Sequence, residues 1–336
     1  MIAIHNSQIG FFPRWVKYCK EKSIPYKIVD CYQSDIIEQL NGCSALLWHH
    51  WQVSYKDMLK AKRILFALEH AGIKVFPNFK TGWHFDDKIS QKYLLEALNL
   101  PLVKSYHFVD KNDAIDWASK TEYPKVFKLK SGAGSANVKL ARNKRQTLDL
   151  IEKAFGRGFS NYDGFEALKE RFDKFKQGKD SFIGVLKSIY RVFSPPLYAK
   201  MMGRLRFEVY FQEFIPNSDS DIRVIVVGNK AFAIKRLVRK NDFRASGSGN
   251  ILYEKELFDE SLIKKSFEFS KKLGTQVVAF DYVFLNNEPL IVEISYGYAI
   301  EGYDKCKGFW DENLNFYPGP FDSTNWIIED LLKEIN

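Results

Sequence analysis

The sequence lacks the runs and spacings that mark membrane-spanning, secreted or disulfide-stapled proteins. No stretch approaches about 18 consecutive apolar residues, which excludes a transmembrane helix of ordinary length. No charged region precedes the first apolar residues, so the N-terminus predicts a β-strand and not a signal peptide. The four cysteines show no CxxC or metal-ligand spacing. Together these absences indicate a cytoplasmic protein with reduced thiols.

Common nucleotide- and nucleic-acid-binding signatures are also missing. The chain has no G-x-G-x-x-G fingerprint and no glycine-rich loop that ends in G-K-[ST]. Its basic residues are not arranged around a known nucleic-acid-binding module, which argues against a nucleic-acid partner. What remains is a chain of 336 residues with 46% apolar and 27% charged residues. This composition predicts a globular protein of two or three domains.

The positive charge is concentrated in one segment. The formal net charge is +9, from 50 basic and 41 acidic residues, and residues 157–206 hold 11 Lys or Arg against 5 Asp or Glu. Within this segment phenylalanines recur at helical spacing from Phe165 to Phe175, and a second apolar stretch runs from Phe182 to Phe193. The pattern predicts a helical insertion over residues 156–206. Such an insertion either packs on the protein or contacts a membrane interface or another anionic partner.

Outside this segment, short apolar runs alternate with amphipathic stretches. In the first 80 residues the alternation is a β-α-β-α rhythm, which predicts an open parallel sheet. The predicted strands are Ile2–His5, Tyr26–Val29, Ala45–Trp48, Lys74–Phe76, 104–109, 125–130, 207–215, 222–227 and 230–238. The predicted helices are 11–22, 34–41, 55–71, 86–99, 111–119, 145–155 and 260–273. The pattern as a whole predicts an α/β protein with α+β subdomains.

The most informative stretch is residues 280–295. Asp281 ends one apolar run, Asn286 and Asn287 are typical turn residues, and a second apolar run ends at Glu293. This order predicts a β-hairpin with one carboxylate on each strand. Two facing carboxylates suit Mg²⁺, a hard cation that takes oxygen ligands and shares them with substrate phosphates. The alternative is a pair of solvated strand charges.

Two further segments carry groups that suit a nucleotide. A loop of small residues follows the strand at 125–130, and such loops let backbone N–H groups approach phosphate oxygens. Its candidate residues are Ser131, Gly132, Gly134 and Ser135. A second strand ends at Gln212, Glu213, Phe214 and Ile215, where exposed backbone groups can read an adenine edge. Neither segment need bind a nucleotide. The loop can instead be a tight hairpin, and the residues after the second strand can be an acidic turn.

Arginines gather in the segment that follows. Asp221 and Arg223 begin a strand, and Lys235, Arg236, Arg239 and Arg244 crowd the region after it. Arginine suits multidentate contacts with phosphate and carboxylate groups. Several arginines near two metal-binding carboxylates supply the positioning and charge neutralisation that phosphoryl transfer needs.

The order of these motifs resembles the ATP-grasp superfamily, and within it the ribosomal-protein glutamate ligase branch of carboxylate–amine ligases. In chain order the motifs are Asp87-Lys88, Lys128 with its loop, Gln212–Ile215, Asp221–Arg223, Asp242–Arg244, and Asp281 with Glu293. The resemblance covers roughly residues 75–300 and implies an ATP-grasp fold in three parts. These are an N-terminal α/β domain (1–80), a central lid subdomain with the helical insertion (81–206), and a C-terminal catalytic subdomain (207–336).

The resemblance also implies an activity and a set of roles. A carboxylate attacks the γ-phosphate of ATP to give an acylphosphate and ADP, and an amine then displaces phosphate to give an amide. The implied phosphate contacts are Lys88, Lys128, Arg223 and Arg244. The implied nucleotide contacts are Gln212, Glu213, Phe214, Ile215 and Asp221. Asp281 and Glu293 match ligands of Mg²⁺, with Mn²⁺ as an alternative ion.

Two positions depart from the family pattern. The family usually has Asn two residues after the metal-binding Glu, where this chain has Ser295, and it tends to have Gly where Asn137 stands. Serine offers a hydroxyl oxygen on a shorter side chain, so Ser295 is kept as a third candidate ligand. The departures leave two other functions open: a non-catalytic ATP-binding or scaffold protein, and a kinase that stops at a phosphorylated small molecule.

The substrates are less defined than the nucleotide. His49, His50 and Trp51 end a strand of the N-terminal sheet, where open α/β sheets present ligand contacts. Residues 297–304 directly follow the metal-binding strand and are predicted to border the acceptor site. Aromatic residues of the C-terminal segment either stack on sugar rings or pack in the core. The predicted partners are therefore a small-molecule carboxylate and an amine. One predicted substrate pair is an amino acid and a sugar acid of a surface polysaccharide. The alternative substrates are a peptide or a pair of amino acids.

Overall fold

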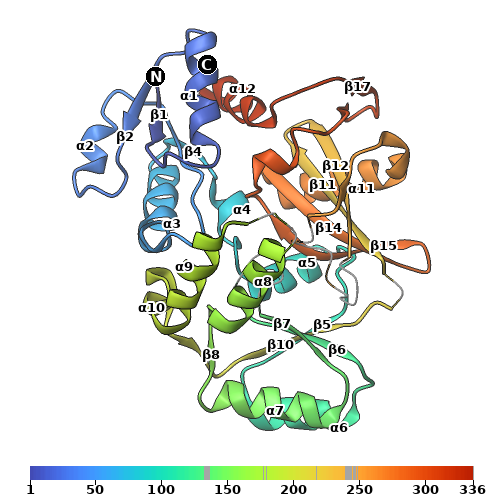
Figure 1. Cartoon of the computed structure of the whole chain (residues 1–336). Coiled ribbons are helices and arrows are strands. Elements are labelled where there is room, and N and C mark those ends of the chain that lie inside the picture. Colours follow the sequence, from blue (N-terminus) through green and yellow to red (C-terminus); the bar gives the residue numbers. More distant parts are fainter. Residues whose placement is uncertain are drawn as a thin grey trace. The chain divides into compact units, whose positions relative to one another are not determined.

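The computed structural model describes residues 1–131, 137–176, 178, 180–216, 218–238, 244, 247 and 249–335. The chain divides into two compact units (Figure 1). The first unit contains Met1–Phe85, Ser90–Leu102 and Ile215–Asn336, and the second contains Asp86–Ile89 and Val103–Phe214. None of the helices in the described part of the chain has the length and apolarity that crossing a bilayer requires. The three-part division with boundaries at 80 and 206 stays a prediction.

The N-terminal strands of the first unit form a parallel sheet. Its order is β2-β1-β3-β4, with β1 at Ile2–His5, β2 at Tyr26–Val29, β3 at Ala45–Leu47 and β4 at Lys74–Phe76. The helices are α1 (Phe12–Glu21), α2 (Ile36–Gln39), α3 (Tyr55–His70) and α4 (Phe79–Gly82). The strands β1 and β3 are buried along their whole length, as expected for central strands of a parallel sheet. The predicted open parallel sheet is confirmed.

A larger antiparallel sheet lies in the C-terminal part of the first unit. Its order is β15-β14-β11-β12-β16-β17, and β13 pairs with β12. The strands are β11 (Ser220–Val227), β12 (Lys230–Leu237), β13 (Ile251–Leu252), β14 (Val277–Leu285), β15 (Glu288–Ser295), β16 (Gly308–Asp311) and β17 (Phe316–Pro318). Asn286 and Asn287 connect β14 to β15 with φ angles of 52° and 64°, as in a type I′ turn. The predicted hairpin is therefore confirmed.

The two faces of this sheet contribute to different cores, because successive residues of a strand point to opposite faces. Val224 and Phe280 pack on one face with α5 (Lys88–Ala97) and α11 (Glu260–Leu273). Ile225 and Ile234 pack on the other face with Tyr298 and with α12 (Ser323–Ile335). Two short 3₁₀ helices, η1 (Lys255–Leu257) and η2 (Ile300–Gly302), lie in the connections. The face with Ile225 and Ile234 also carries charged residues on β11, β12 and β14.

The second unit is built around an antiparallel sheet in the order β5-β10-β6-β7. Its strands are β5 (Ser105–Phe108), β6 (Lys125–Lys128), β7 (Val138–Ala141) and β10 (Val209–Glu213). The helices α6 (Lys111–Lys120) and α7 (Lys144–Phe155) pack on one face against Phe127 and Phe211. Their contact positions include Ala114 and Ala154, and these small residues let the helices lie close to the sheet. The opposite face carries Lys128 and Gln212.

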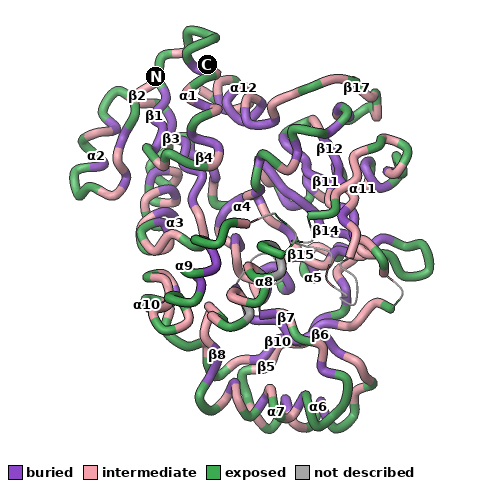
Figure 2. Tube along the Cα trace, viewed as in Figure 1, coloured by how far each residue is buried: buried purple, intermediate pink, exposed green. Residues whose placement is uncertain are grey.

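The predicted helical insertion of the second unit is confirmed. It consists of α8 (Gly164–Lys176), α9 (Phe182–Phe193) and α10 (Leu197–Met202), flanked by the paired strands β8 (Phe159–Ser160) and β9 (Arg204–Leu205). Figure 2 shows how much of this segment is exposed compared with the buried strands of the sheets. The sequence does not predict β7, β16 or β17, because runs of three or four residues are too short to reveal a period.

Candidate functional site

Three charged residues form a row across adjacent strands of the C-terminal sheet. Arg223 on β11 pairs directly with Asp281 on β14, and Asp281 pairs directly with Glu293 on β15. Asp221 on β11 pairs with Arg236 on β12, two residues further along the same face. Residues that face each other in an antiparallel pair place their side chains on the same side of the sheet. The register therefore gathers two arginines and three carboxylates on one face.

The arginines bind the carboxylates through short, paired hydrogen bonds. Nη2 of Arg223 donates to Oδ2 of Asp281 at 2.6 Å, while its Nε donates to Oδ1. Arg236 donates to both oxygens of Asp221 at 2.6 Å, and its Nη2 also lies 3.0 Å from Oδ2 of Asp281. Asp281 is thus shared by two guanidinium groups. Such bidentate contacts fix the positions of the side chains as well as their charges.

These contacts set the ionisation of the two aspartates. Burial by itself raises the pKa of Asp281, but the charges of Arg223 and Arg236 outweigh burial and hold that pKa well below its ordinary value. Burial, reinforced by the charge of Asp281, raises the pKa of Asp221 despite its pairing with Arg236. Asp281 is therefore an anion over the whole physiological pH range. It offers carboxylate oxygens without first losing a proton.

The donor set fits a hard divalent cation. Asp281 and Glu293 supply carboxylate oxygens from facing strands, and oxygen is the ligand that Mg²⁺ prefers. Within the described part of the chain, His, Cys, Asp and Glu side chains form no group of three or more that could hold a metal ion. Two protein carboxylates are few for a closed metal site, but they suit an ion that keeps waters and substrate phosphates as its other ligands.

Ser295 lies on the same face and has a local partner. Its hydroxyl donates to the carbonyl oxygen of Gly297 at 3.0 Å and accepts from the N–H of Gly297 at 3.2 Å. The serine therefore turns the chain as it leaves β15. Metal binding by Ser295 stays a prediction.

Sequence reasoning did not assign two residues that complete this group. Arg236 appears in the sequence only as one of several clustered basic residues, and Tyr303 as one of many aromatics. Tyr303 is buried, and its hydroxyl accepts from Nη1 of Arg223 at 3.4 Å. The sequence does contain a signal for the pairing of Arg236. Gly228 and Asn229 form a two-residue turn between β11 and β12, and counting an equal number of residues outwards from this turn on both strands pairs Asp221 with Arg236. Tyr303 lies in the segment 297–304 that was predicted to border the acceptor site, but its contact with Arg223 has no local signal, because it lies in the connection between β15 and β16.

The second unit contains a separate polar group around Lys128 and Gln212. Both side chains are buried, and Nζ of Lys128 donates to Oε1 of Gln212 at 2.6 Å. Nε2 of Gln212 donates to Oγ of Ser105 at 3.1 Å, and the Tyr210 hydroxyl donates to the same oxygen at 2.9 Å. These residues alternate along β5, β6 and β10, which places them on the face opposite α6 and α7. The amine of Lys128 is therefore buried on this face of the sheet, with Gln212 as one of its partners.

Glu213 points to the other face of that sheet. Lys125 donates to its Oε2 at 2.7 Å, and the Tyr106 hydroxyl donates to its Oε1 at 2.8 Å. Burial together with the Glu213 carboxylate raises the pKa of Tyr106 above its ordinary value. The carboxylate is thus held by two side chains. A nucleotide contact by Glu213 stays a prediction.

The other predicted nucleotide contacts are less completely described. Lys88 is buried at the start of α5, and its backbone N–H donates to the carbonyl of Lys130 at 2.8 Å. The Ser131 hydroxyl donates to Oδ1 of Asn161 at 2.9 Å. Arg244 is half-buried. Gly132, Gly134, Ser135, Arg239 and Asp242 lie outside the described residues. The functional roles of all these residues stay predictions.

The two neighbouring histidines of the N-terminal domain are buried. The ring of His49 stacks on Phe11 at 3.7 Å between centroids, and its Nδ1 accepts from the backbone N–H of Phe11. Burial lowers the pKa of His49 to about 3. The Tyr296 hydroxyl donates to the carbonyl of His50 at 3.0 Å, which joins this strand end to the segment after β15. Both histidines are therefore neutral groups in the core of the first unit.

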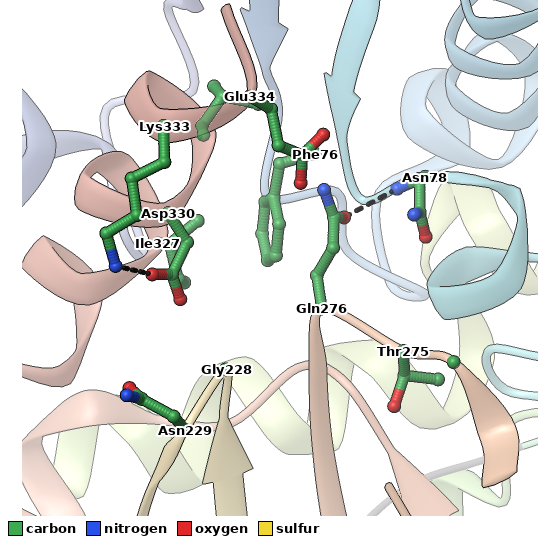
Figure 3. A pocket seen from close by; sticks show the side chains of 12 residues that line it. Phe76, Asn78, Gly228, Asn229, Thr275, Gln276, Ile327, Asp330, Lys333 and Glu334 are labelled. Atoms are coloured by element: carbon green, nitrogen blue, oxygen red, sulfur yellow. Dashed lines mark hydrogen bonds and ion pairs between the residues drawn. The ribbon is translucent and has the colours of Figure 1, made fainter. Parts of the chain in front are cut away.

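A pocket of about 460 Å³ lies at the beginning of β14 in the first unit. Its walls include Phe76 at the end of β4, Gln276 before β14, and Asp330 of α12 (Figure 3). Oε1 of Gln276 accepts from the N–H of Asn78 at 2.9 Å, so this side chain links the two sheets of the unit. The residues that line the pocket include none of the predicted site residues. It is distinct from the charged row, which lies further along β14.

Comparisons with known proteins agree with this arrangement. Residues 197–310 match the family described as the RimK-like ATP-grasp domain. The alpha-aminoadipate–LysW ligase LysX of Saccharolobus solfataricus is 22% identical over 241 residues, which are 70% of this chain and 70% of that protein. The "Probable alpha-L-glutamate ligase 1" of Shewanella sp. (strain ANA-3) is 30% identical over 128 residues, which are 38% of this chain and 42% of that protein.

A solved structure extends the likeness to the whole fold. The ATP-grasp ligase PsnB, complexed with a minimal precursor, Mg and ADP, superposes with a TM-score of 0.57 at 13% identity. The match covers 99% of this chain and 98% of that chain. The fold is therefore that of the ATP-grasp ligases, and the predicted fold is confirmed. The match of residues 197–310 to the RimK-like ATP-grasp domain confirms the predicted resemblance.

Proposed function

We propose that the protein joins a small-molecule carboxylate to an amine through an acylphosphate. A carboxylate oxygen of the substrate attacks the γ-phosphorus of ATP, and the bond to the β,γ-bridging oxygen breaks to release ADP. The amine nitrogen then attacks the acyl carbon and loses a proton as phosphate leaves. The observation that carries this proposal is the row of Arg223, Asp281 and Glu293 inside the RimK-like domain.

Asp281 and Glu293 are the proposed metal ligands, with Ser295 as a third. Mg²⁺ bound there neutralises phosphate charge and orients the transferred group. The arginines keep Asp281 ionised, so a ligand oxygen is present before the ion arrives. Arg223 is also proposed to stabilise charge that develops on the transferred phosphoryl group, because its guanidinium lies directly beside the metal-binding carboxylate.

The remaining roles follow the family positions. Lys88, Lys128 and Arg244 are proposed to neutralise phosphate charge, as fixed positive groups favour phosphoryl transfer. The residues proposed to bind the nucleotide are Ser131, Gly132, Gly134, Ser135, Gln212, Glu213, Phe214, Ile215 and Asp221. No side chain is proposed as a covalent nucleophile, so catalysis is alignment together with electrostatic stabilisation.

An amino acid is the best-supported substrate class. The two sequence relatives carry alpha-aminoadipate and glutamate in their names, and both are amino acids. A sugar acid of a surface polysaccharide was the other predicted partner, on the ground of the aromatic C-terminal segment and the basic insertion. Tyr298, Tyr303, Trp310 and Trp326 are buried, which supports packing as their role. We therefore propose an amino acid or peptide for at least one substrate.

Hydroxamate formation tests the proposal directly. The protein is incubated with Mg-ATP, hydroxylamine and pools of amino acids, peptides and sugar acids. Hydroxylamine intercepts an acylphosphate, so the natural amine need not be known. Glu293→Gln is run in parallel and is expected to lose turnover. Glu288→Gln is the matched control, because it makes the same change at an exposed position of the same strand.

The outcomes separate the three functions. Hydroxamate with equal ADP supports the ligase and identifies the acid. ADP with a stable phosphorylated product and no hydroxamate supports a kinase. ATP binding without turnover from any pool supports a non-catalytic protein, and a large gain of activity in Ser295→Asn then shows that the metal site has decayed.

A further inference from the structure

The helix α9 in the second unit turns its large apolar side chains to solvent. Six of them form what we call the α9 face, and all are exposed: Phe182, Ile183, Leu186, Ile189, Tyr190 and Phe193. Phe182 is 60% exposed and Phe193 is 84% exposed. The residues that α9 buries are the smaller Gly184, Val185 and Ser188. Figure 2 marks residues of this helix as exposed along its length.

This orientation reverses the usual arrangement of an amphipathic helix. A helix on the surface of a globular protein normally buries its apolar stripe and exposes its polar one. Here the small residues are buried and the bulky ones are exposed. Contiguous exposed apolar surface of this kind marks an interaction site in soluble proteins.

Basic side chains border the α9 face, and Asp180, which directly precedes the N-cap of this helix, pairs with Arg171. Residues 181–206 contain five Lys or Arg and no Asp or Glu. Lys187 and Arg191 are exposed and follow Ile183 by four and eight residues, so they run along the edge of the face. Lys200 on α10 is exposed as well. Any partner that covers this face must therefore accept positive charge at its border.

The neighbouring helices α8 and α10 also expose apolar side chains and lysines. Phe175 of α8 is exposed, and its ring lies 6.1 Å from that of Phe182. Nζ of Lys176 lies 4.6 Å above the ring of Phe172. Leu197 of α10 is also exposed. The apolar surface is therefore continuous from α8 to the start of α9, and lysines accompany it.

An anionic bilayer matches both properties at once. An in-plane amphipathic helix inserts its apolar face at the boundary between headgroups and acyl chains, while Lys and Arg contact the acidic headgroups. We propose that the α9 face docks the protein reversibly on an anionic lipid surface. The docking is independent of the ligation chemistry, since α9 contains none of the proposed site residues.

Flotation with lipid vesicles tests the proposal on the full-length protein. One set of vesicles is pure phosphatidylcholine, and in a second set a third of the lipid is phosphatidylglycerol. The protein is expected to float with the second set, and raising the salt from about 0.1 M to about 0.5 M is expected to weaken binding. Lys187→Gln with Arg191→Gln is expected to lower affinity for the anionic vesicles roughly tenfold to thirtyfold.

A second variant tests the apolar contribution. Phe182→Ser with Phe193→Ser removes the two ends of the α9 face and is expected to abolish flotation. The matched control is Val109→Ser, an exposed apolar residue of the same unit at 69% exposure and outside the insertion. Circular dichroism confirms that all variants are folded. Since these residues are exposed, their replacement leaves no cavity.

Three results overturn the proposal. The first is no binding to either vesicle. The second is binding that neither double variant changes. The third is a concentration-dependent dimer, seen by analytical ultracentrifugation, without binding to vesicles. If Phe182→Ser with Phe193→Ser abolishes this dimer, the α9 face binds a second copy of the chain.

Discussion

Arg223 and Asp281 face each other on adjacent strands, and Nη2 of the arginine lies 2.6 Å from Oδ2 of the carboxylate. Asp281 in turn faces Glu293 on the next strand. The carboxylate that we propose as a metal ligand is thereby held as an anion by protein groups alone. We also propose that the same arginine stabilises charge on the transferred phosphoryl group. This double use of one guanidinium predicts that replacing Arg223 by lysine, which keeps the charge, affects chemistry more than folding.

The first prediction concerns Arg223→Lys. Lysine keeps the charge but loses the planar fork that binds both oxygens of Asp281. We expect ADP release under saturating ATP to fall about a hundredfold, which is the usual loss when one group that stabilises the transition state is removed. The Tm is expected to change little. Arg142→Lys, an exposed position, is the control. Unchanged turnover in Arg223→Lys contradicts the proposed role.

The second prediction concerns the stability of the first unit. Arg236→Met leaves Asp221 and Asp281 buried with one fewer positive charge, and removing one partner of a buried ion pair costs about 3 to 5 kcal/mol. We expect a fall in Tm of about 5 to 10 °C by calorimetry. Combining Arg236→Met with Asp221→Asn is expected to recover part of the loss, because the uncompensated negative charge is removed. A double variant no more stable than the single one refutes this account.

The third prediction concerns the dependence of stability on pH. Burial lowers the pKa of His5 to about 4, with the charge of Asp30 opposing the shift, and burial lowers the pKa of His49 to about 3. The unfolded chain takes up these protons below about pH 6.5, while the folded protein does not. Stability is therefore expected to fall as the pH drops from 6.5 towards 4, by at most about 1.4 kcal/mol per pH unit for each histidine.

Urea unfolding at several pH values checks this prediction. His5→Gln is expected to flatten the slope between pH 6.5 and pH 4, because the unfolded chain then binds one proton fewer. His70→Gln is the control, since His70 is exposed. A slope in His5→Gln equal to that of the unaltered protein shows that His5 is protonated in the folded state.

The fourth prediction concerns nucleotide binding by the second unit. Lys128→Met keeps a long side chain but removes a buried positive charge that the family position assigns to a phosphate of ATP. Loss of one charge-assisted hydrogen bond of about 2 kcal/mol raises the Kd for ATP roughly thirtyfold. Isothermal titration with a non-hydrolysable ATP analogue measures this change. Lys139→Met on β7 is the control because Lys139 is exposed. Equal affinity in Lys128→Met and the unaltered protein excludes a phosphate contact.

Local patterns made much of the fold predictable. The N-terminal strands were located to within a residue because each is a short apolar run between turn residues. The hairpin of Asp281 and Glu293 was predictable because Asn286 and Asn287 favour the positive φ angles that a type I′ turn requires. The insertion was recognisable from phenylalanines at helical spacing. These features depend on residues that are near each other in the chain.

Contacts between distant residues were less accessible. Glu213 was predicted to contact the nucleotide from a strand end, and only the structure shows that its carboxylate binds Lys125 and Tyr106 on two other strands. His49 was a candidate ligand contact, yet it is stacked on Phe11 in the core. In both cases the sequence showed a polar group at a strand end. Only the packing of other elements around that group decided which partner it has.

The sequence by itself determined the elements and the order of the motifs, because strand length, turn type and helical period are set by local sterics and by the spacing of apolar residues. It also determined that residues 181–206 are basic and apolar. The tertiary structure decided which charges meet. Strand register placed Arg223 and Arg236 on Asp281, and burial gave those pairs their strength, since water no longer competes for the charges. The tertiary structure likewise decided that α9 packs through its small residues and leaves the large ones exposed.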